Sequence, residues 1–509
     1  MDKKRLTILM VAAIIAMAFW VFPAGARELL LLDKPLTLLG FATQEAALGM
    51  HNAYDTEAGL QSALMNLFVE AEYKVFPQFK FYTSEKLSVD WAYQLNANRD
   101  SWEDKGFDKS RHRFNVDDRY WQILNEAHVT WTPGNFFFRL GKQIVSWGEV
   151  TAFRVMDQIN PVDYRRGFAD VEFENTLIPI WLLRSEYYPR ISTNWLQDLA
   201  FEFVFNPNVT WIPNQDILLG NDDGGIWAPN IRFYAPGTPG NMIRIGSANY
   251  DVHKPNKWSE EGFGYAFRTK GVVKDFIVSL NYYYGLDHSP VLKSKNQQPI
   301  PPSVAEDGRL IIHPALFGRY PLVRYVGLTA TRDIPFLKYT PIGGIAPVFR
   351  FETFYEFNET FVSPRNTFEK SDELRIGLGI DWKIKIPLLN PKAFFAISPE
   401  IIYRRLINLP GGGAQFTDTG TNLVKRNNYQ GTLALSTTYF NAKLAPSIYY
   451  WRDFTQKADF MRLQATYYWS SHWLATVGLV LLSGARPNVG FEPFDQKDYI
   501  DFKITYKWS

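Results

Sequence analysis

The amino-acid sequence predicts an all-β fold: a transmembrane antiparallel β-barrel of about eighteen strands, with sixteen as the alternative count. Three features of the 509-residue chain lead to this prediction: an export signal at its start, apolar residues that recur at every second position, and connections that are alternately short and long. A soluble β-sandwich or propeller would share the alternation, but it would need neither the export signal nor the ordered series of turns and loops.

The start of the chain has the pattern of a cleaved signal peptide. A basic stretch over 3–5 precedes an apolar stretch over 6–22, and a small-x-small cleavage site follows. We therefore expect a signal peptide over 1–26 and a mature barrel over 27–509, with an uncleaved membrane anchor as the alternative. Export of a large, aromatic-rich chain predicts a place in the outer membrane of a Gram-negative cell.

The composition excludes several classes of function. The chain has no cysteine, so it can form no disulfide, no thiolate metal site and no covalent attachment to haem. Its seven histidines are not spaced as metal ligands, and we predict no metal and no cofactor. The formal net charge of the whole chain is +2, and the predicted signal peptide carries +2 of it. The mature chain therefore has a net charge of 2 − 2 = 0. Without an excess of basic residues, we predict no nucleic-acid partner.

The alternation predicts which residues face lipid. Every second residue is apolar in 87–95, 375–386 and 500–508, and in 349–357 apart from Thr353; the residues between them are mostly small or polar. Such segments are typical of strands with one apolar and one polar face. Because each unpaired backbone group costs several kcal/mol in hydrocarbon, a sheet that spans a membrane must close on itself.

The connections form two classes that alternate along the chain. Short turns are expected at 77–78, 132–135, 189–197, 271–274, 333–344, 387–391, 440–441 and 470–471. Long or polar loops are expected at 49–58, 99–118, 147–173, 207–260, 286–320, 359–372, 406–428, 454–458 and 485–497. Outer-membrane barrels show this asymmetry, with periplasmic turns and extracellular loops, and both ends of the barrel then lie on the periplasmic side.

The longest loop, 207–260, exceeds the usual length of a connection without a function. It contains the aromatic side chains of Trp211, Trp227 and Trp258. Because burial of one large ring stabilises a fold by a few kcal/mol, we expect this loop to fold over or into the barrel mouth and to narrow the pore. A cap that packs only on neighbouring loops is the alternative.

The polar face of the strands carries charges of both signs. Charges that face lipid are costly, so we expect these side chains to face the lumen. The pore-lining candidates are Glu126, Arg139, Gln143, Glu149, Arg350, Glu352, Arg375, Asp381, Arg404 and Arg462. They either set a field across a water-filled pore or pair with each other and partly fill it.

No catalytic residue is predicted. His128 lies two residues from Glu126 on the same strand face, and Ser471 and His472 share a short turn, but neither pair has a hydrolase motif such as G-x-S-x-G. A lumen-facing polar side chain that bonds to a neighbouring strand is the favoured interpretation of His128.

The most specific pattern in the chain lies within 119–165. It reads N-E-A-H-V at 125–129, R-L-G-K-Q at 139–143, W-G-E at 147–149 and I-N-P-V-D at 159–163. This pattern resembles the thirteen-oh-two family of domains of unknown function, which are large porin-like outer-membrane barrels of proteobacteria.

The resemblance extends to G-L-D-H-S-P at 285–290 and R-Y-V-G-L at 324–328, and it covers most of the mature chain. Members are often encoded near exporters of the resistance-nodulation-division type that move lipids or hydrophobic molecules. The resemblance therefore implies traffic of hydrophobic solutes and a periplasmic or inner-membrane transporter as partner.

The motif around 139–149 has two interpretations. In the structural one, which we favour, its two glycines allow a bulge or a close backbone approach, and Trp147 is an anchor at the membrane interface. In the functional one, Arg139, Gln143 and Glu149 form a cluster on the pore wall.

The predicted function is a porin-like channel for passive transport of small solutes, which the resemblance extends to hydrophobic ones. The alternative is a structural barrel that sheaths a multihaem cytochrome in a transmembrane electron conduit; an outer-membrane hydrolase is disfavoured. The expected partners are outer-membrane lipid, lipopolysaccharide and the barrel-assembly machinery, which reads an aromatic C-terminal strand such as 500–508.

Overall fold

A computed structural model provides the structure of the protein. It describes residues 27–50, 59–92, 123–150, 155–163, 176–214, 244–245, 249–295, 301–304, 310–313, 315–339, 344–363, 365–409, 424–485, 490–495 and 497–508. The predicted signal peptide, 1–26, lies outside these residues. Among the described residues, no helix has the length and apolar character needed to cross a membrane.

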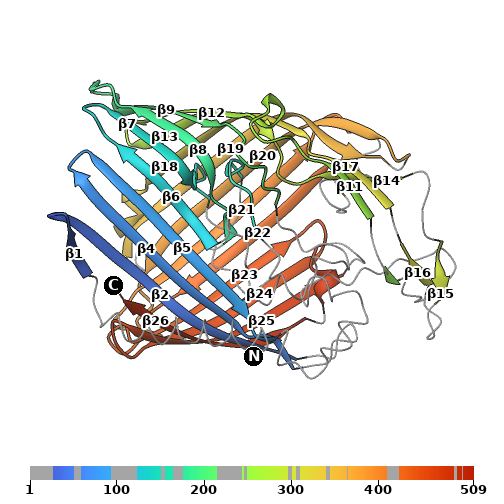
Figure 1. Ribbon diagram of the computed structural model, residues 1–509. Helices are drawn as coiled ribbons and strands as arrows, with labels where there is room; N and C mark the ends of the chain where they lie inside the picture. Colours follow the sequence, from blue (N-terminus) through green and yellow to red (C-terminus); the bar gives the residue numbers. More distant parts are fainter. Residues whose placement is uncertain are drawn as a thin grey trace, which may run out of the picture.

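Eighteen long antiparallel strands form a closed barrel (Figure 1). The barrel strands are β2 (Lys34–Gly49), β4 (Leu64–Phe76), β5 (Phe79–Asp90), β6 (Leu124–Trp131), β7 (Phe136–Gln143), β8 (Ile180–Tyr187), β9 (Leu196–Asn206), β12 (Gly264–Val273), β13 (Phe276–Leu286), β18 (Leu322–Asp333), β19 (Gly344–Val362), β20 (Phe368–Ile384), β21 (Phe395–Leu406), β22 (Asn427–Ser436), β23 (Leu444–Asp453), β24 (Ala458–Tyr468), β25 (Trp473–Gly484) and β26 (Tyr499–Trp508).

Pairing between the first and last barrel strands closes the sheet. Strand β2 pairs with β26 from Gly40 opposite Trp508 to Gly49 opposite Tyr499, and it pairs with β4 on its other edge. The remaining elements are short: β1 (Arg27–Leu31) and β3 (Leu60–Ser62) on β2, the sheet of β10 (Arg244–Ile245), β15 (Ser303–Val304) and β16 (Leu310–Ile312), the sheet of β11 (Asn249–His253), β14 (Val291–Ser294) and β17 (Ala315–Arg319), and the 3-10 turns η2 (Glu260–Gly262), η3 (Pro335–Tyr339) and η5 (Glu492–Phe494).

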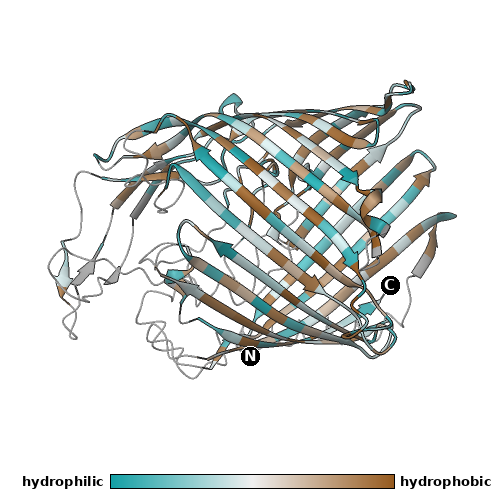
Figure 2. Ribbon diagram, turned by 180° about the vertical axis from the view of Figure 1, so that it is seen from behind, coloured by the Kyte–Doolittle hydropathy of each residue, from teal (hydrophilic) through white to brown (hydrophobic). Residues whose placement is uncertain are grey.

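The two faces of the barrel wall differ in the way the alternation predicts. In β18 the side chains of Leu322, Val326 and Leu328 are exposed, whereas Val323 and Tyr325 between them are buried. Bands of apolar residues cross the outside of the strands in Figure 2. Stacked rings also lie on the outer face near the turns, as in Phe136 on Tyr187 at 4.9 Å. This is the aromatic girdle of a membrane barrel.

The predicted fold class is confirmed, and the count of eighteen strands is correct. Turns such as 77–78 between β4 and β5, and 470–471 between β24 and β25, lie at one end of the barrel with the end of β26. The two small sheets, one of β10, β16 and β15 and the other of β11, β17 and β14, lie at the opposite end, among the long loops (Figure 1). We call these ends the turn side and the loop side.

We predict that a charge on the outer face of β13 destabilises the inserted barrel. Leu280 lies in the middle of the strand with 61% of its side chain exposed, and it faces outward. Leu280→Arg should lower the free energy of unfolding in lipid vesicles by about 2–4 kcal/mol, because the guanidinium would face hydrocarbon. Ile277→Arg is the matched control: Ile277 is 41% exposed but faces the lumen, so its change should be much smaller. Equal losses for the two variants would contradict the assignment of the faces.

Candidate functional site

The connection between β7 and β8 folds into the barrel instead of extending away from it. Its described residues, 144–150, 155–163 and 176–179, form one apolar cluster with inward-facing residues of the wall. In Figure 1 this teal part of the chain runs inside the ring of strands. We call the described residues 144–150 and 155–163 the inserted segment. The cluster contains Val145, Trp147, Val150, Val155, Met156 and Ile159 of this segment and, from the wall, Leu182, Val204, Ala266, Tyr283, Val323, Tyr325, Phe354 and Ile402.

One asparagine holds the two ends of the inserted segment together. The Oδ1 atom of Asn160 accepts a hydrogen bond from the backbone N–H of Val145 at 2.8 Å. Its Nδ2 atom donates to the carbonyl oxygens of Gln143 at 3.1 Å and Ile178 at 3.0 Å. The following residue, Pro161, disfavours a helical backbone at Asn160 and keeps the chain extended there. The I-N-P-V-D motif therefore closes the base of the segment.

A carboxylate on a remote strand fixes the far part of the segment. Glu352 of β19 accepts hydrogen bonds from the backbone N–H groups of Glu149 at 3.0 Å and Val150 at 3.1 Å. Its side chain is completely buried. Within the segment, Asp157 accepts from the backbone N–H groups of Trp147 at 2.6 Å and Gly148 at 3.0 Å. Buried N–H groups that would otherwise lack partners are thus satisfied.

The wall is shaped to receive the segment. A Cβ atom at Gly327 would lie 2.3 Å from Cε of Met156, so only a residue without a side chain leaves room for this methionine. Gly377 leaves similar room for Val150, whose Cγ2 would be 3.1 Å away. Beside this hollow, the hydroxyl of Tyr325 donates to the carbonyl oxygen of Met156 at 2.8 Å.

Trp147 fixes the segment to the opposite part of the wall. Its indole Nε1–H donates to Oε2 of Glu202 on β9 at 3.2 Å. Glu202 also binds Nε of Arg184 at 2.8 Å and Nε of Arg268 at 3.6 Å, and the guanidinium of Arg268 lies 5.9 Å from the centre of the indole ring. Only 2% of Trp147 is exposed. The prediction that this residue anchors the membrane interface is therefore wrong, because the chain turns inward after β7 ends at Gln143.

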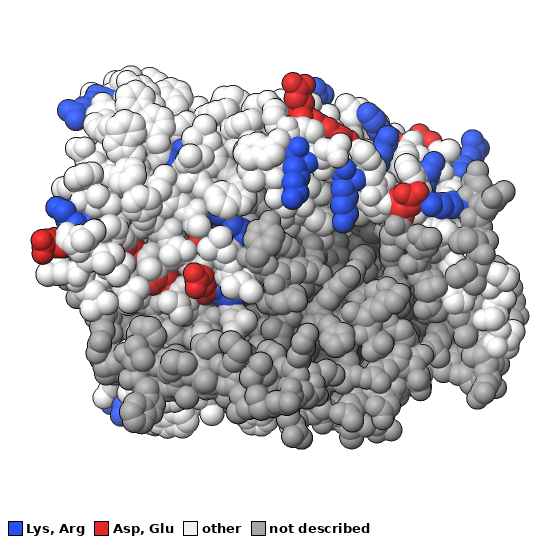
Figure 3. Space-filling view, viewed as in Figure 1, with Lys and Arg blue, Asp and Glu red and all other residues white. Residues whose placement is uncertain are grey.

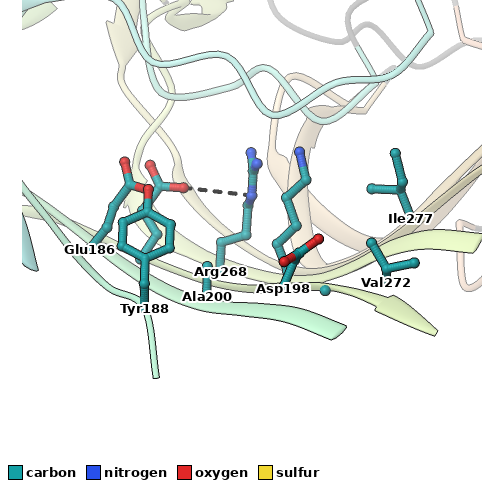
Figure 4. Close-up of a pocket in the computed structure, with 10 residues that line it drawn as sticks. Glu186, Tyr188, Asp198, Ala200, Arg268, Val272 and Ile277 are labelled. Atoms are coloured by element: carbon teal, nitrogen blue, oxygen red, sulfur yellow. Dashed lines mark hydrogen bonds and ion pairs between the residues drawn. The ribbon is translucent and has the colours of Figure 1, made fainter. Parts of the chain in front are cut away.

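A recess of about 350 Å³ lies on the turn side of the Trp147 anchor (Figure 4). We call it the turn-side recess. It lies along the ends of β8, β9, β12 and β13, and its lining residues are Glu186, Tyr188, Asp198, Ala200, Glu202, Arg268, Lys270, Gly271, Val272 and Ile277.

Charges of both signs line the turn-side recess. Within the described part of the chain, neither Asp198 nor Lys270 has an ion-pair partner. Tyr188 donates a hydrogen bond to Glu186. Burial together with this bond raises the pKa of Tyr188 to about 12, so its hydroxyl stays protonated at neutral pH. The recess therefore offers hydrogen-bond donors and acceptors to a solute.

Ion pairs cover another part of the inner wall. Arg350 binds Asp381 at 2.8 Å and Glu400 at 3.2 Å. Further inward pairs are Arg375 with Glu373, Arg404 with Glu373, Arg404 with Glu359 at 2.9 Å, and Arg462 with Asp501 at 3.4 Å. On this part of the wall the charges pair with each other, which is one of the two arrangements considered from the sequence.

Nine of the ten pore-lining candidates lie on the inner face of the wall strands, and Glu149 lies in the inserted segment. Gln143 and Glu352 are fully buried beneath the inserted segment, where Gln143 donates to the carbonyl oxygen of Leu182 at 3.1 Å. The other eight remain partly accessible or belong to the ion pairs. Contacts that involve three of the candidates are Glu126 with the N–H of Ile144 at 3.2 Å, Arg139 with Thr130 at 3.1 Å and Glu149 with Thr331 at 3.3 Å.

The tryptophans of the 207–260 loop are in different environments. The ring of Trp211 stacks on His288 at 4.9 Å and meets Tyr320 at 5.0 Å, so it packs on neighbouring connections. Trp258 is 64% exposed, and Trp227 lies outside the described residues. Ile212 of the same loop joins the cluster around the inserted segment. The predicted narrowing of the pore by this loop stays a prediction.

The inner wall has no sign of a metal centre or a hydrolase pair within the described residues. No group of three or more His, Asp or Glu side chains could hold a metal ion there. His128 stacks on Tyr82 with 5.0 Å between ring centres, and the ring of His472 bonds to the carbonyl oxygen of Lys507 at 2.9 Å. Neither ring bonds to a serine hydroxyl or a carboxylate.

Sequence reasoning missed the residues of the wall that receive the inserted segment. Tyr325 and Gly327 belong to the R-Y-V-G-L stretch that carries part of the family resemblance, and they contact Met156, which lies between the other two motifs. The available signal was the glycine between apolar residues on a strand, which often marks a close approach of another chain segment. The motifs that define the resemblance therefore meet in space.

An eighteen-strand antiparallel barrel that is narrowed from within by a connecting segment is a porin-like barrel. The family model described as "Protein of unknown function (DUF1302)" matches residues 49–508. The chain belongs to this family, as its motifs predict. A comparison with curated protein sequences gave no match.

Several solved porin-like structures are similar in fold. OccAB3 of Acinetobacter baumannii is 9% identical with a TM-score of 0.48, and OccK1 of Pseudomonas aeruginosa is 7% identical with a TM-score of 0.43; each alignment covers 94% of this chain and 99% of the other. OmpF of Salmonella typhi, in complex with daunomycin, is 11% identical with a TM-score of 0.38, and its alignment covers 93% of this chain and 98% of that one.

We predict that Asn160→Asp loosens the base of the inserted segment while the barrel stays intact. The substitution keeps the shape of the side chain but replaces the two N–H donors by an oxygen that faces two carbonyl oxygens. Hydrogen exchange of residues 145–163 in the vesicle-inserted protein should become at least about tenfold faster, since a net loss of roughly 1–3 kcal/mol is expected for such groups. Exchange in β20–β26 should not change. Equal exchange of the segment in both proteins would show that Asn160 does not hold it.

Proposed function

We propose that the protein is a channel of the outer membrane through which small water-soluble solutes diffuse passively. The observation that supports this proposal most directly is the inserted segment, which is bonded to β9 on one side and to β19 on the other through Glu202 and Glu352. Barrels of sixteen to eighteen strands enclose an aqueous lumen unless something fills it. A segment held across that lumen narrows it without a separate plug domain.

The charges of the inner wall support water-soluble solutes. The apolar inward side chains, such as Val204 and Phe354, are buried in contact with the inserted segment. The turn-side recess exposes charged and hydrogen-bonding groups instead. Traffic of hydrophobic molecules, which the family resemblance implies, would use the apolar part of the recess, Val272 and Ile277. We favour water-soluble solutes because charged groups of both signs line the same recess.

The outer-membrane location is supported by the outer face of the barrel. Exposed aliphatic side chains cover the middle of the strands, and aromatic rings lie near the turns. Short turns at one end and long loops at the other are typical of outer-membrane barrels, whose loops are extracellular. Cleavage of a signal peptide before residue 27 remains part of this proposal.

The alternative function, a sheath around a multihaem cytochrome, is less well supported. A sheath must leave its lumen free for the cytochrome. Here the inserted segment occupies part of the lumen with its own apolar core, and residues of the β25–β26 connection, such as Phe491 against Trp451 at 4.6 Å, occupy more of it. The interior is thus already in use by the chain itself.

We predict that removal of the inserted segment widens the channel. Because the N–H of Val145 bonds to Asn160, the two ends of the segment lie side by side, and residues 147–158 can be replaced by two glycines. The single-channel conductance of this variant in planar bilayers should be severalfold larger than that of the unchanged protein. Heat-modifiable mobility on gels checks that the barrel has folded.

A second deletion distinguishes the two candidate constrictions. Residues 214–254 of the long loop are replaced by a short Gly-Ser linker. If this variant conducts more ions while the 147–158 deletion leaves the conductance unchanged, the loop and not the inserted segment limits the pore. A folded wild-type barrel that shows no conductance at all would contradict the channel itself.

We predict that a charge reversal in the turn-side recess changes ion selectivity. Lys270 faces the recess without an ion-pair partner among the described residues, so Lys270→Glu should shift the reversal potential in a salt gradient toward cations. The shift should be largest below about 0.1 M salt, where the screening length exceeds about 10 Å. Lys443→Glu, at a turn outside the lumen, carries the same charge change and should leave the potential unchanged. Identical shifts for both variants would mean that the recess is not on the ion path.

A further inference from the structure

Three exposed cations lie on the outer face of the barrel near its loop side. Arg324 lies in β18, Lys370 in β20 and Arg405 in β21, and all three side chains are exposed. Each alternates with a buried or inward neighbour: Val323 and Tyr325 flank Arg324, for example, and Tyr325 is fully buried. The strands β18, β19, β20 and β21 are consecutive in the sheet, so the cations share one part of the outer wall.

The cations lie near the loop-side margin of the apolar belt, where the exposed Leu322 is the next outward residue beyond Arg324. Along β18, the exposed Val326 and Leu328 lie two and four residues from Arg324, on the same face and closer to the turns. Ile401 has the same relation to Arg405 in β21, at four residues. With about 3.4 Å per residue, the cations lie roughly 7–14 Å beyond these hydrocarbon-facing side chains. In the proposed outer-membrane location, this is the depth at which we expect lipid headgroups.

Aromatic rings accompany the cations at this depth. The guanidinium of Arg324 lies 4.9 Å from the ring centre of Phe357, and Tyr284 opposite it in the register is partly exposed. Tyr403 and Tyr429 stack at 5.0 Å on the face that carries Arg405. Tyrosine at the edge of the apolar belt is typical of the membrane interface.

The described part of the chain does not neutralise these cations. Within the described residues, no carboxylate forms an ion pair with Arg324, Lys370 or Arg405. The nearby Asp372 accepts from the hydroxyl of Tyr355 at 2.8 Å and from the N–H of Asn358 at 2.9 Å instead. By contrast, Arg452 on the outer face of β23 binds Asp459 at 3.0 Å.

Lys and Arg side chains also gather on the adjoining part of the loop side. Figure 3 shows them on the face near β11, β14 and β17. In this region Arg319 and Lys293 lie over the ring of Phe368, at 4.3 and 4.9 Å from its centre. Acidic side chains lie among them in Figure 3, and Lys295 pairs with Asp251 at 2.9 Å, so charges of both signs are mixed on this part of the loop side.

We infer that Arg324, Lys370 and Arg405 form a binding site for the phosphate groups of lipopolysaccharide in the outer leaflet. Arginine binds phosphate with two parallel hydrogen bonds, and lysine adds a point charge. Three strand spacings of about 4.8 Å separate Arg324 from Arg405, so the site spans roughly 14 Å. Acyl chains would then lie on the apolar belt below. The inference needs the outer-membrane location but not conduction, so it can fail while the proposed channel function holds.

The test compares the full-length purified barrel with R324Q/K370Q/R405Q and with R452Q as the matched control. After removal of bound lipid in detergent, each protein is titrated with rough lipopolysaccharide, and binding is measured by native mass spectrometry. Loss of one cation should weaken binding roughly fivefold, and loss of all three on the order of a hundredfold. The R452Q variant should bind like the unchanged protein, because Asp459 already neutralises Arg452. Gel mobility confirms that each variant is folded.

Two further probes identify the ligand chemistry. The first probe is lipopolysaccharide whose phosphates have been removed. It should bind the unchanged protein weakly, with the affinity that intact lipopolysaccharide has for the triple variant. Phosphatidylglycerol, which is anionic but lacks the phosphorylated disaccharide, should bind much more weakly than lipopolysaccharide. Equal binding of both lipids, equal binding after dephosphorylation, or an unchanged affinity of the triple variant would each overturn the inference.

Discussion

The whole structure depends on the need of every strand in the membrane to have both of its edges paired. Strand β2 meets this need by pairing with β4 on one edge and with β26 on the other, which joins the start of the barrel to its end. Hydrocarbon offers no hydrogen bonds to an unpaired edge, so closure is obligatory. Closure also sends one face of every strand to lipid and leaves the enclosed face for polar groups and for the segments that occupy the lumen.

Closure reverses the usual place of an apolar core. Aliphatic side chains on the outer face of the strands meet lipid, and a separate small core forms inside the lumen between the inserted segment and the wall. Its geometry depends on the absence of a side chain at Gly327, which leaves the space that Met156 fills. Its polar contacts are few but buried: Glu352 accepts two backbone N–H bonds, and each of these donors would cost about 1–3 kcal/mol if it were left without an acceptor.

The barrel could be predicted from the sequence because each strand carries its own signal. Alternation over ten residues assigns both faces of a strand without knowledge of its neighbours, so the inward direction of Arg350 or Arg404 could be predicted. The inserted segment could not, because its contacts join distant residues. Trp147 bonds to a carboxylate 55 residues away, and the N–H of Glu149 to one 203 residues away. From the sequence alone, a tryptophan just after a strand could lie at the membrane interface or inside the barrel. Only the register of β9 and β19, which places Glu202 and Glu352, decides between these two positions.

In the proposed channel, the attachment of the inserted segment at three places would make it a fixed constriction and not a moving gate. Asn160 joins its two ends, Trp147 bonds to β9, and Glu352 holds the backbone beyond the tryptophan from β19. A loop tied at its base alone could swing about that base, whereas a segment tied to two walls can move only if buried N–H groups lose their partners. In that channel the width of the passage would be constant, and discrimination between solutes would depend on the charges that stay accessible beside it, those of the turn-side recess.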